Sequence, residues 1–167
     1  MTDELMIEDV LAYCSHLPIA AFAPGDVLIG EGPASNRLYI LIGGEVEVLR
    51  GDTQVAEIGE TGAIFGEMSV LLGIDHTATV RAVSSVSAYR IDDARDFLRS
   101  QTEVSFHVAR ILARRLMDAT TYLADFKRQF AHRNDHFGMV DEVLDALIQR
   151  QRPAVAGGSE LKSDSRL

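Results

Sequence analysis

Short apolar runs separated by closely spaced turn residues dominate the chain from residue 19 to residue 91. The runs are rich in Val, Ile, Leu and Tyr, which favour strands, and the breaks contain Gly, Pro, Asn and Asp, which favour tight turns. The apolar runs lie at residues 27–29, 38–42, 46–49, 55–58, 78–82 and 86–91. Many short strands joined by tight turns predict a small β-barrel or jelly roll.

Helical periodicity flanks this β-rich region on both sides. A short amphipathic helix is predicted over residues 3–16, and a long one over residues 104–130, where apolar residues mark one face without Gly or Pro. At 1.5 Å per residue the long helix reaches about 40 Å, more than a domain of this size needs to cover its own core. A further helix is predicted from about residue 137 to residue 151, and residues 153–167 lack periodicity.

Charge is distributed unevenly along the chain, whose formal net charge is −9. Residues 1–100 hold 16 acidic against 6 basic side chains, whereas residues 101–133 hold 3 against 6. Because nonspecific DNA binding depends on Lys and Arg neutralising phosphates, the acidic first hundred residues argue against it. The basic residues of the long helix are expected to lie beside its apolar face or to pair with the acidic β-rich region.

Signals for membrane insertion or secretion are not found in the sequence. It has no run of eighteen apolar residues, and its first residues are acidic where a signal peptide is basic, so we expect a cytoplasmic protein. Cys14 is the single cysteine, which excludes an internal disulfide and a cysteine-ligated iron–sulfur cluster. We expect Cys14 to be a small buried hydrophobe of the first helix.

Residues 65–82, hereafter the cassette, read Phe-Gly-Glu-Met-Ser-Val-Leu-Leu-Gly-Ile-Asp-His-Thr-Ala-Thr-Val-Arg-Ala. This segment resembles the phosphate-binding cassette of cyclic-nucleotide-binding domains. Residues 22–28 resemble the first strand and turn of that family, residues 38–48 its central hairpin, and residues 113–116 the helix that follows its β-roll, including in the bacterial catabolite-activator branch. The resemblance covers more than half of the chain and implies a mainly β fold with flanking helices, a β-roll or jelly roll followed by a long dimerisation helix.

Together these patterns predict four segments. They are an N-terminal helix and β-roll sensor domain at 1–103, a long dimerisation helix at 104–133, a C-terminal helix at 134–152 and a disordered tail at 153–167.

The resemblance also implies a ligand site. In the family the Gly and Glu of the cassette bind the ribose 2′-OH, which points to the backbone of Gly66 and the carboxylate of Glu67. Residues 69–72 are implied to form a short helix that helps to hold an anion, and Thr77 to reach the cyclic phosphate or a guanine. The predicted ligand-binding residues are Phe65, Gly66, Glu67, Met68, Ser69, His76, Thr77, Ala78 and Thr120. The alternative is structural, with Gly66 a turn residue, Glu67 a solvated acid and Thr77 a strand residue.

His76 stands where the family usually has Arg. An imidazole offers at most two donors and no permanent charge, so its phosphate contact is expected to be about ten- to a hundredfold weaker. In one interpretation His76 becomes protonated beside the phosphate, so that binding strengthens at low pH. In others the pocket takes another anion or nothing, His76 ligates haem as in a carbon-monoxide-sensing branch, or His76 simply faces solvent.

The long helix resembles the dimer helix of catabolite-activator proteins, which implies a homodimer through residues 104–130. Thr120 falls where those relatives contact adenine, whereas Ala119 departs from their pattern; alternatively Thr120 is an ordinary helix-surface residue. His132 and His136 are four residues apart, but with no third metal ligand a hinge between helices is the preferred interpretation.

The sequence therefore predicts a noncatalytic, dimeric sensor of cAMP or cGMP that signals to an unknown effector protein. No nucleophile–base arrangement or metal cluster is recognised, so neither catalysis nor a resident cofactor is expected. A helix-turn-helix is not recognised after residue 153, so DNA binding is not expected. The alternative function is an interaction module whose pocket is inert or binds another anion, and a truncated transcription regulator is a third hypothesis.

Overall fold

The computed structural model describes residues 3–130 and 137–149 of the chain, which divides into two compact units, residues 1–112 and residues 113–167. The division into four segments predicted from the sequence stays a prediction. The described elements are α1 (Asp3–Cys14), β1 (Ile19–Phe22), β2 (Val27–Ile29), β3 (Leu38–Gly43), β4 (Val46–Arg50), β5 (Thr53–Ile58), β6 (Ile64–Phe65), α2 (Glu67–Leu72), β7 (Thr79–Ala82), β8 (Val86–Ile91), α3 (Ala94–Ser100), α4 (Thr102–Phe130) and α5 (Phe137–Gln149).

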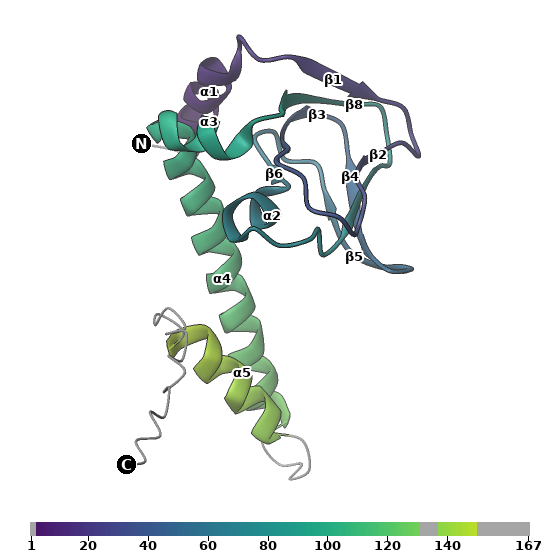
Figure 1. Ribbon diagram of the computed structural model, residues 1–167. Helices are drawn as coiled ribbons and strands as arrows, with labels where there is room; N and C mark the ends of the chain where they lie inside the picture. The colour runs from purple at the N-terminus through teal and green to yellow at the C-terminus, as the bar shows by residue number, and fades with distance from the viewer. Residues whose placement is uncertain (1–2, 131–136, 150–167) are drawn as a thin grey trace, which may run out of the picture. The chain divides into compact units, whose positions relative to one another are not determined.

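The strands of the first unit form two four-stranded antiparallel sheets, as Figure 1 shows. One sheet has the order β1-β8-β3-β6 and the other the order β2-β7-β4-β5. Strand β6 lies at the edge of the first sheet, where Phe65 pairs with Tyr39 of β3. The predicted β-roll with flanking helices is confirmed, and β6 places the start of the cassette beside β3.

Strand β3 is buried on both faces, and its alternating side chains serve two separate cores. Tyr39 and Leu41 join apolar residues of both sheets inside the β-roll. Leu38 and Ile40 point to the opposite face, where they pack with helices. All four side chains are at most 3% exposed, so strand alternation alone commits β3 to the centre of the first unit.

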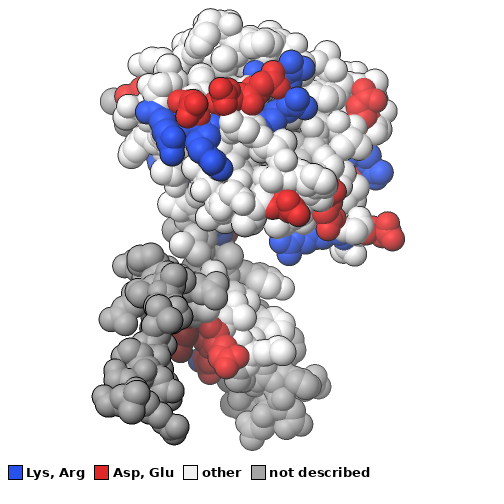
Figure 2. Space-filling view, viewed as in Figure 1, with Lys and Arg blue, Asp and Glu red and all other residues white. Residues whose placement is uncertain are grey.

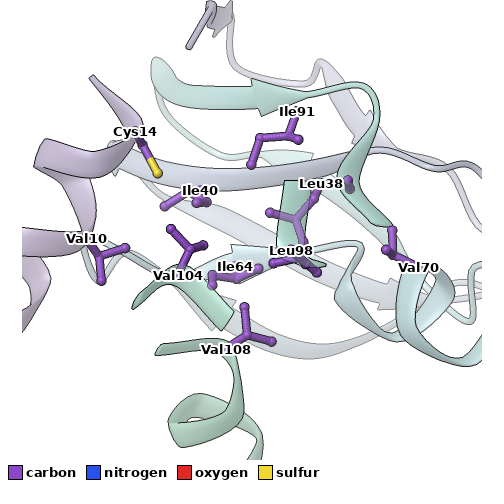
Figure 3. Close-up of a cluster of buried hydrophobic side chains, with 11 residues drawn as sticks. Val10, Cys14, Leu38, Ile40, Ile64, Val70, Ile91, Leu98, Val104 and Val108 are labelled. Atoms are coloured by element: carbon purple, nitrogen blue, oxygen red, sulfur yellow. The ribbon is translucent and has the colours of Figure 1, made fainter. Parts of the chain in front are cut away.

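Helices cover the outer face of the sheet β1-β8-β3-β6 (Figure 3). Val10 and Cys14 come from α1, Val70 from α2, and Val104 and Val108 from the first turns of α4. Cys14 is fully buried, as predicted, and burial raises the pKa of its thiol to about 11. Because the thiolate is the reactive form, Cys14 is an unreactive packing residue at neutral pH.

The helical region after the β-roll differs from the expectation. The sequence predicted helical periodicity only from about residue 104, but a separate helix, α3, begins at Ala94. It ends at Ser100; the following residue, Gln101, has a φ of −112° and a ψ of 88°, which are not helical, and α4 starts at Thr102. The apolar residues of α3 are few because the helix is short, so its periodicity does not stand out in the sequence.

The second unit contains the rest of α4 together with α5. Lys127 of α4 donates to Asp141 of α5, and Arg128 lies 3.4 Å from Asp125 on its own helix. These two basic residues therefore pair within their own unit and not with the β-roll. None of the described helices is long and apolar enough to cross a membrane. The predicted tail and the pair His132 and His136 lie outside the described residues.

Candidate functional site

The cassette opens with a glycine that no other residue replaces without strain. Gly66 follows β6 with φ 94° and ψ −4°, in the left-handed region, and forms the N-cap of α2. A Cβ at this position would lie 2.5 Å from the carbonyl oxygen of Arg37 and 3.1 Å from Cδ1 of Ile29. Backbone conformation and backbone contact thus both require glycine here. Gly66 is a turn residue, as the structural alternative supposed, and its backbone lies close to Arg37 and Ile29.

Glu67 is the first residue of α2 and only 4% exposed. The alternative that it is a solvated acid is therefore wrong. The helix begins at Glu67, two residues before the predicted start. Carboxylates are rarely buried this far in proteins unless they are paired, so Glu67 is a polar group set inside the fold.

Polar bonds and one apolar anchor hold α2 in place. Val70 is 1% exposed in the helix-side core, and its carbonyl oxygen accepts hydrogen bonds from Nε and Nη2 of Arg95 at 3.3 and 3.1 Å. Ser69 is buried, and its hydroxyl donates to the carbonyl oxygen of Ile74 at 2.6 Å. Of the other predicted residues here, Phe65 is buried in the β-roll core and Met68 is 43% exposed.

His76 is fixed at the far end of the cassette by backbone and side-chain bonds. Its backbone N–H donates to the carbonyl oxygen of Gly32 at 2.7 Å and its carbonyl oxygen accepts from Gly32 at 3.0 Å. The ring nitrogen Nε2 lies 2.9 Å from the hydroxyl oxygen of Ser35. With 9% exposure, His76 does not face solvent, so that interpretation is wrong.

Ser35 is a residue that the sequence analysis missed. It lies 41 residues from His76, on an exposed connection between β2 and β3, and no motif marks it. Its hydroxyl lies within hydrogen-bonding distance of the imidazole, a spacing of potential nucleophile and base that the sequence did not reveal. The pairing of Gly32 with His76, an isolated bridge between distant segments, helps to bring the two side chains together.

The same connection is tied to α3 through Asn36. The side chain of Asn36 donates to Asp93 at 2.7 Å and accepts from the backbone N–H of Arg95 at 2.9 Å. Its carbonyl oxygen accepts from the backbone N–H of Ala94 at 3.0 Å. Because Arg95 in turn binds Val70 of α2, the start of α3 is bonded both to α2 and to the connection that carries Ser35.

The remaining predicted residues are placed as follows. Thr77 is exposed and Ala78 is partly buried, and the next threonine, Thr79, accepts a 3.0 Å bond from the backbone N–H of Glu31. Thr120 belongs to the second unit, where its hydroxyl donates to carbonyl oxygens of the preceding helical turn at 2.9 Å. Its place in a ligand site stays a prediction.

Electrostatically, the cassette is poor in positive charge. Residues 51–80 contain five acidic residues and no Lys or Arg. Arg81, the next basic residue, is held by Glu47 at 2.7 Å, and other arginines lie beside acids on the face shown in Figure 2. His76 is the one histidine of residues 51–80, and histidine is the residue type that changes charge near neutral pH. No cluster of three or more His, Cys, Asp or Glu suited to a metal ion occurs in the described part of the chain.

The sequence of the chain is similar to those of characterised proteins. Residues 19–100 match the family model described as the cyclic nucleotide-binding domain. The CRP-like cAMP-activated global transcriptional regulator of Mycobacterium tuberculosis is 32% identical over 124 residues, covering 70% of this chain and 54% of the regulator. The cAMP-dependent protein kinase regulatory subunit of Hypocrea atroviridis is 40% identical over 65 residues, covering 39% of this chain and 14% of the subunit. The chain thus spans about half, or less, of the length of these relatives.

Solved structures show the same fold. The catabolite activator protein of Thermus thermophilus superposes with a TM-score of 0.58 at 21% identity, covering 89% of this chain and 84% of that protein. A cyclic nucleotide-binding domain from Methylobacillus flagellatus gives a TM-score of 0.58 at 24% identity, covering 69% of this chain and 70% of that chain. At such identities the likeness extends to the fold alone.

Proposed function

Because the chain belongs to the cyclic nucleotide-binding domain family, we propose that it is a noncatalytic sensor whose β-roll binds cAMP or cGMP. The observation that carries the proposal is the buried carboxylate of Glu67 directly after a glycine that the backbone requires, inside a cassette of the family's sequence. In this proposal Glu67 accepts from the ribose 2′-OH and the backbone of Gly66 lies against the sugar. A charge-assisted bond of this kind contributes about 1.5–3 kcal/mol.

The phosphate end of the ligand is assigned to His76, Thr77 and Ala78. Since a neutral imidazole attracts a phosphate less than a guanidinium does, affinity in the high-micromolar to millimolar range is expected. Protonation of His76 supplies the missing charge, so binding strengthens from pH 8 to pH 6. Phe65, Met68 and Ser69 complete the site by shaping the turn around the ligand.

The alternative function is an interaction module whose pocket is inert or takes another anion. The observation that favours it is the acidic character of residues 51–80, which contain five acidic residues and no Lys or Arg. A cyclic nucleotide is itself an anion, so it approaches such a surface against a repulsive field.

Dimerisation through residues 104–130 and signalling to an effector protein form the second part of the proposal. The helix α4 exposes several large apolar side chains in the second unit, including Met117 at 60% and Tyr122 at 70%. Burial of such residues against a second copy removes apolar surface from water. Thr120, on the same helix, is proposed to contact the base. A cytoplasmic location, with no DNA or membrane partner, belongs to the same proposal.

Calorimetric titration of the full chain with cAMP and with cGMP, at pH 6 and at pH 8, tests the ligand. Wild-type protein is expected to bind one of the two more tightly at pH 6. Glu67→Gln is expected to weaken binding about ten- to a hundredfold, because it removes the charge from the sugar contact. Glu60→Gln, at an exposed position, is the matched control and is expected to bind as wild type. No heat at millimolar nucleotide at either pH would reject the proposal in favour of the interaction module.

Sedimentation velocity tests the dimer separately. The full chain is expected to sediment as a dimer, and Tyr122→Glu to shift it towards the monomer because a charge is costly in an apolar contact. A wild-type monomer at high concentration would exclude pairing through α4.

A further inference from the structure

Ser35 and His76 form a contact whose chemistry sets what the imidazole can offer to a ligand. The backbone of His76 is held by two hydrogen bonds with Gly32, and its side chain is 9% exposed. With Nε2 placed 2.9 Å from the hydroxyl oxygen of Ser35, Nδ1 is the ring nitrogen that remains for another partner. A neutral imidazole carries one N–H and one lone pair, so the polarity of the serine contact decides which of them Nδ1 presents.

The two polarities have opposite consequences for an anion. If Nε2–H donates to Ser35, Nδ1 presents a lone pair, which repels a phosphate. If the Ser35 hydroxyl donates to Nε2, Nδ1 carries the proton and presents a donor. When the ring gains a second proton, the hydroxyl turns to accept from Nε2–H, and Nδ1–H is retained. The second polarity therefore offers the same donor in both charge states.

Carboxylates outnumber basic groups in the two segments that carry the pair. Asp75 precedes His76 and accepts from the backbone N–H of Ala34 at 3.1 Å, and Glu31 accepts from Gly51 at 2.9 Å. Arg37, the basic residue nearest in sequence to Ser35, donates to Asp92 at 2.9 Å. The buried Glu67 adds a further carboxylate to the cassette, and no Lys or Arg occurs in residues 1–36. With no Lys or Arg supplied by these segments except Arg37, an anionic phosphate at Nδ1 needs the ring itself as its donor, and the anion stabilises an N–H directed towards it over a lone pair.

We infer that Ser35 is a positioning residue, which donates its hydroxyl proton to Nε2 of His76 and so keeps Nδ1–H as the donor for an anionic phosphate. The inference rests on the proposed function for the identity of the ligand, the cyclic phosphate of a nucleotide. It adds a residue outside the cassette to the site and explains how a histidine serves there even when it is neutral.

The state of the ring is measured first, in the free protein. Long-range ¹H–¹⁵N spectra of histidine-labelled full chain report the tautomer at pH 8, with the His76 signals identified by their loss in His76→Gln. Wild-type protein is expected to show Nδ1–H, Ser35→Ala to show a shift towards Nε2–H, and Ser35→Thr to restore the wild-type pattern. An Nε2–H tautomer in wild-type protein, or an unchanged pattern in Ser35→Ala, would overturn the inference.

Binding of cAMP and cGMP is then compared at pH 5.5 and at pH 8. At pH 8, Ser35→Ala is expected to bind about three- to tenfold more weakly, the effect of one neutral hydrogen bond. At pH 5.5 it is expected to bind within about twofold of wild type, because both ring nitrogens then carry protons. Ser15→Ala, which removes another exposed hydroxyl, from a bond to Ala12, is the control and is expected to leave affinity unchanged at both values.

The pH comparison separates positioning from simple damage to the fold. A loss of the same size at both pH values would assign Ser35 a structural role only and overturn the inference. If wild-type protein binds neither nucleotide, the proposed function fails, while the tautomer measurement in the free protein still decides the role of Ser35.

Discussion

The two ends of the cassette are held by different physical means. At the first end, Gly66 is fixed by a backbone contact that excludes a side chain, and Val70 anchors α2 in the apolar core. At the second end, His76 is held by a strand-like bridge to Gly32 and by a single contact to Ser35. The first end therefore tolerates few substitutions without loss of the fold, whereas the second is held mainly through its backbone, so its side chain can change with less effect on the fold. In the proposed function, this lets the chain keep its fold while the group offered to a phosphate changes.

The largest effect is expected when the glycine of the first end is replaced. Gly66→Ala places a left-handed alanine against the carbonyl oxygen of Arg37, and we expect it to lower the free energy of unfolding by about 3 kcal/mol. Urea denaturation measures it. Gly51→Ala is the control, since Gly51 has φ 54° but no atom within 4 Å of a Cβ, and it is expected to cost about 1 kcal/mol. Equal losses in both variants would show that the contact at Gly66 adds nothing to its backbone conformation.

The next effect concerns the second end and changes affinity more than stability. His76→Arg introduces a permanent charge and a planar donor group, so cyclic-nucleotide affinity is expected to rise about ten- to a hundredfold. The rise should be accompanied by loss of the pH dependence between pH 6 and pH 8, measured by calorimetry. His16→Arg, at an exposed position of the first unit, adds the same charge elsewhere and is expected to leave affinity within about twofold. Equal affinity in His76→Arg and wild type would mean that position 76 does not meet the phosphate.

A smaller effect is expected for the buried hydroxyl in the middle of the cassette. Ser69→Ala removes the bond to the carbonyl oxygen of Ile74 and leaves that oxygen without its side-chain donor, which costs about 1–2 kcal/mol. Thermal or urea unfolding measures the change. Ser100→Ala, which removes an exposed hydroxyl bonded to Phe97 at 2.9 Å, is expected to cost less than about 0.5 kcal/mol. If the two variants are equally stable, the bond from Ser69 to Ile74 does not stabilise the segment between α2 and His76.

The smallest effect is expected at the contact between α3 and α2. Arg95→Met removes both bonds to the carbonyl oxygen of Val70 but keeps the length of the side chain, and we expect a loss of about 0.5–1 kcal/mol. Arg99→Met is the control, because Arg99 is 75% exposed and only 3.7 Å from Asp96 on its own helix. Such surface pairs contribute about 0–0.5 kcal/mol. A larger loss in Arg99→Met than in Arg95→Met would contradict the proposed role of α3 in holding α2.

Much of the fold could be predicted from local patterns. The ranges of β2 and β8 agree with the predicted runs at 27–29 and 86–91, because strand alternation and turn residues are properties of neighbouring positions. Strand β6 and helix α3 were missed, since two residues and seven residues carry too little periodicity to be recognised.

The candidate site, like the fold, could be predicted only in part from the sequence. The sequence of the cassette indicated the family and directed attention to Gly66, Glu67 and His76. It did not indicate that Glu67 is buried, that His76 is covered, or that Ser35 lies beside it. These properties depend on residues far away along the chain, which no local pattern reports.

By itself the sequence determined a mainly β domain with flanking helices, an acidic first hundred residues and a histidine where the family has arginine. Spacing and composition suffice for these because they reflect backbone preferences and the chemistry of single side chains. Only the tertiary structure decided that Gly66 has no room for a side chain and that Ser35 meets His76 across 41 residues. The physical reason is that steric exclusion and hydrogen-bond polarity depend on atoms brought together by strand pairing, and such contacts exist only once the two segments have folded against each other.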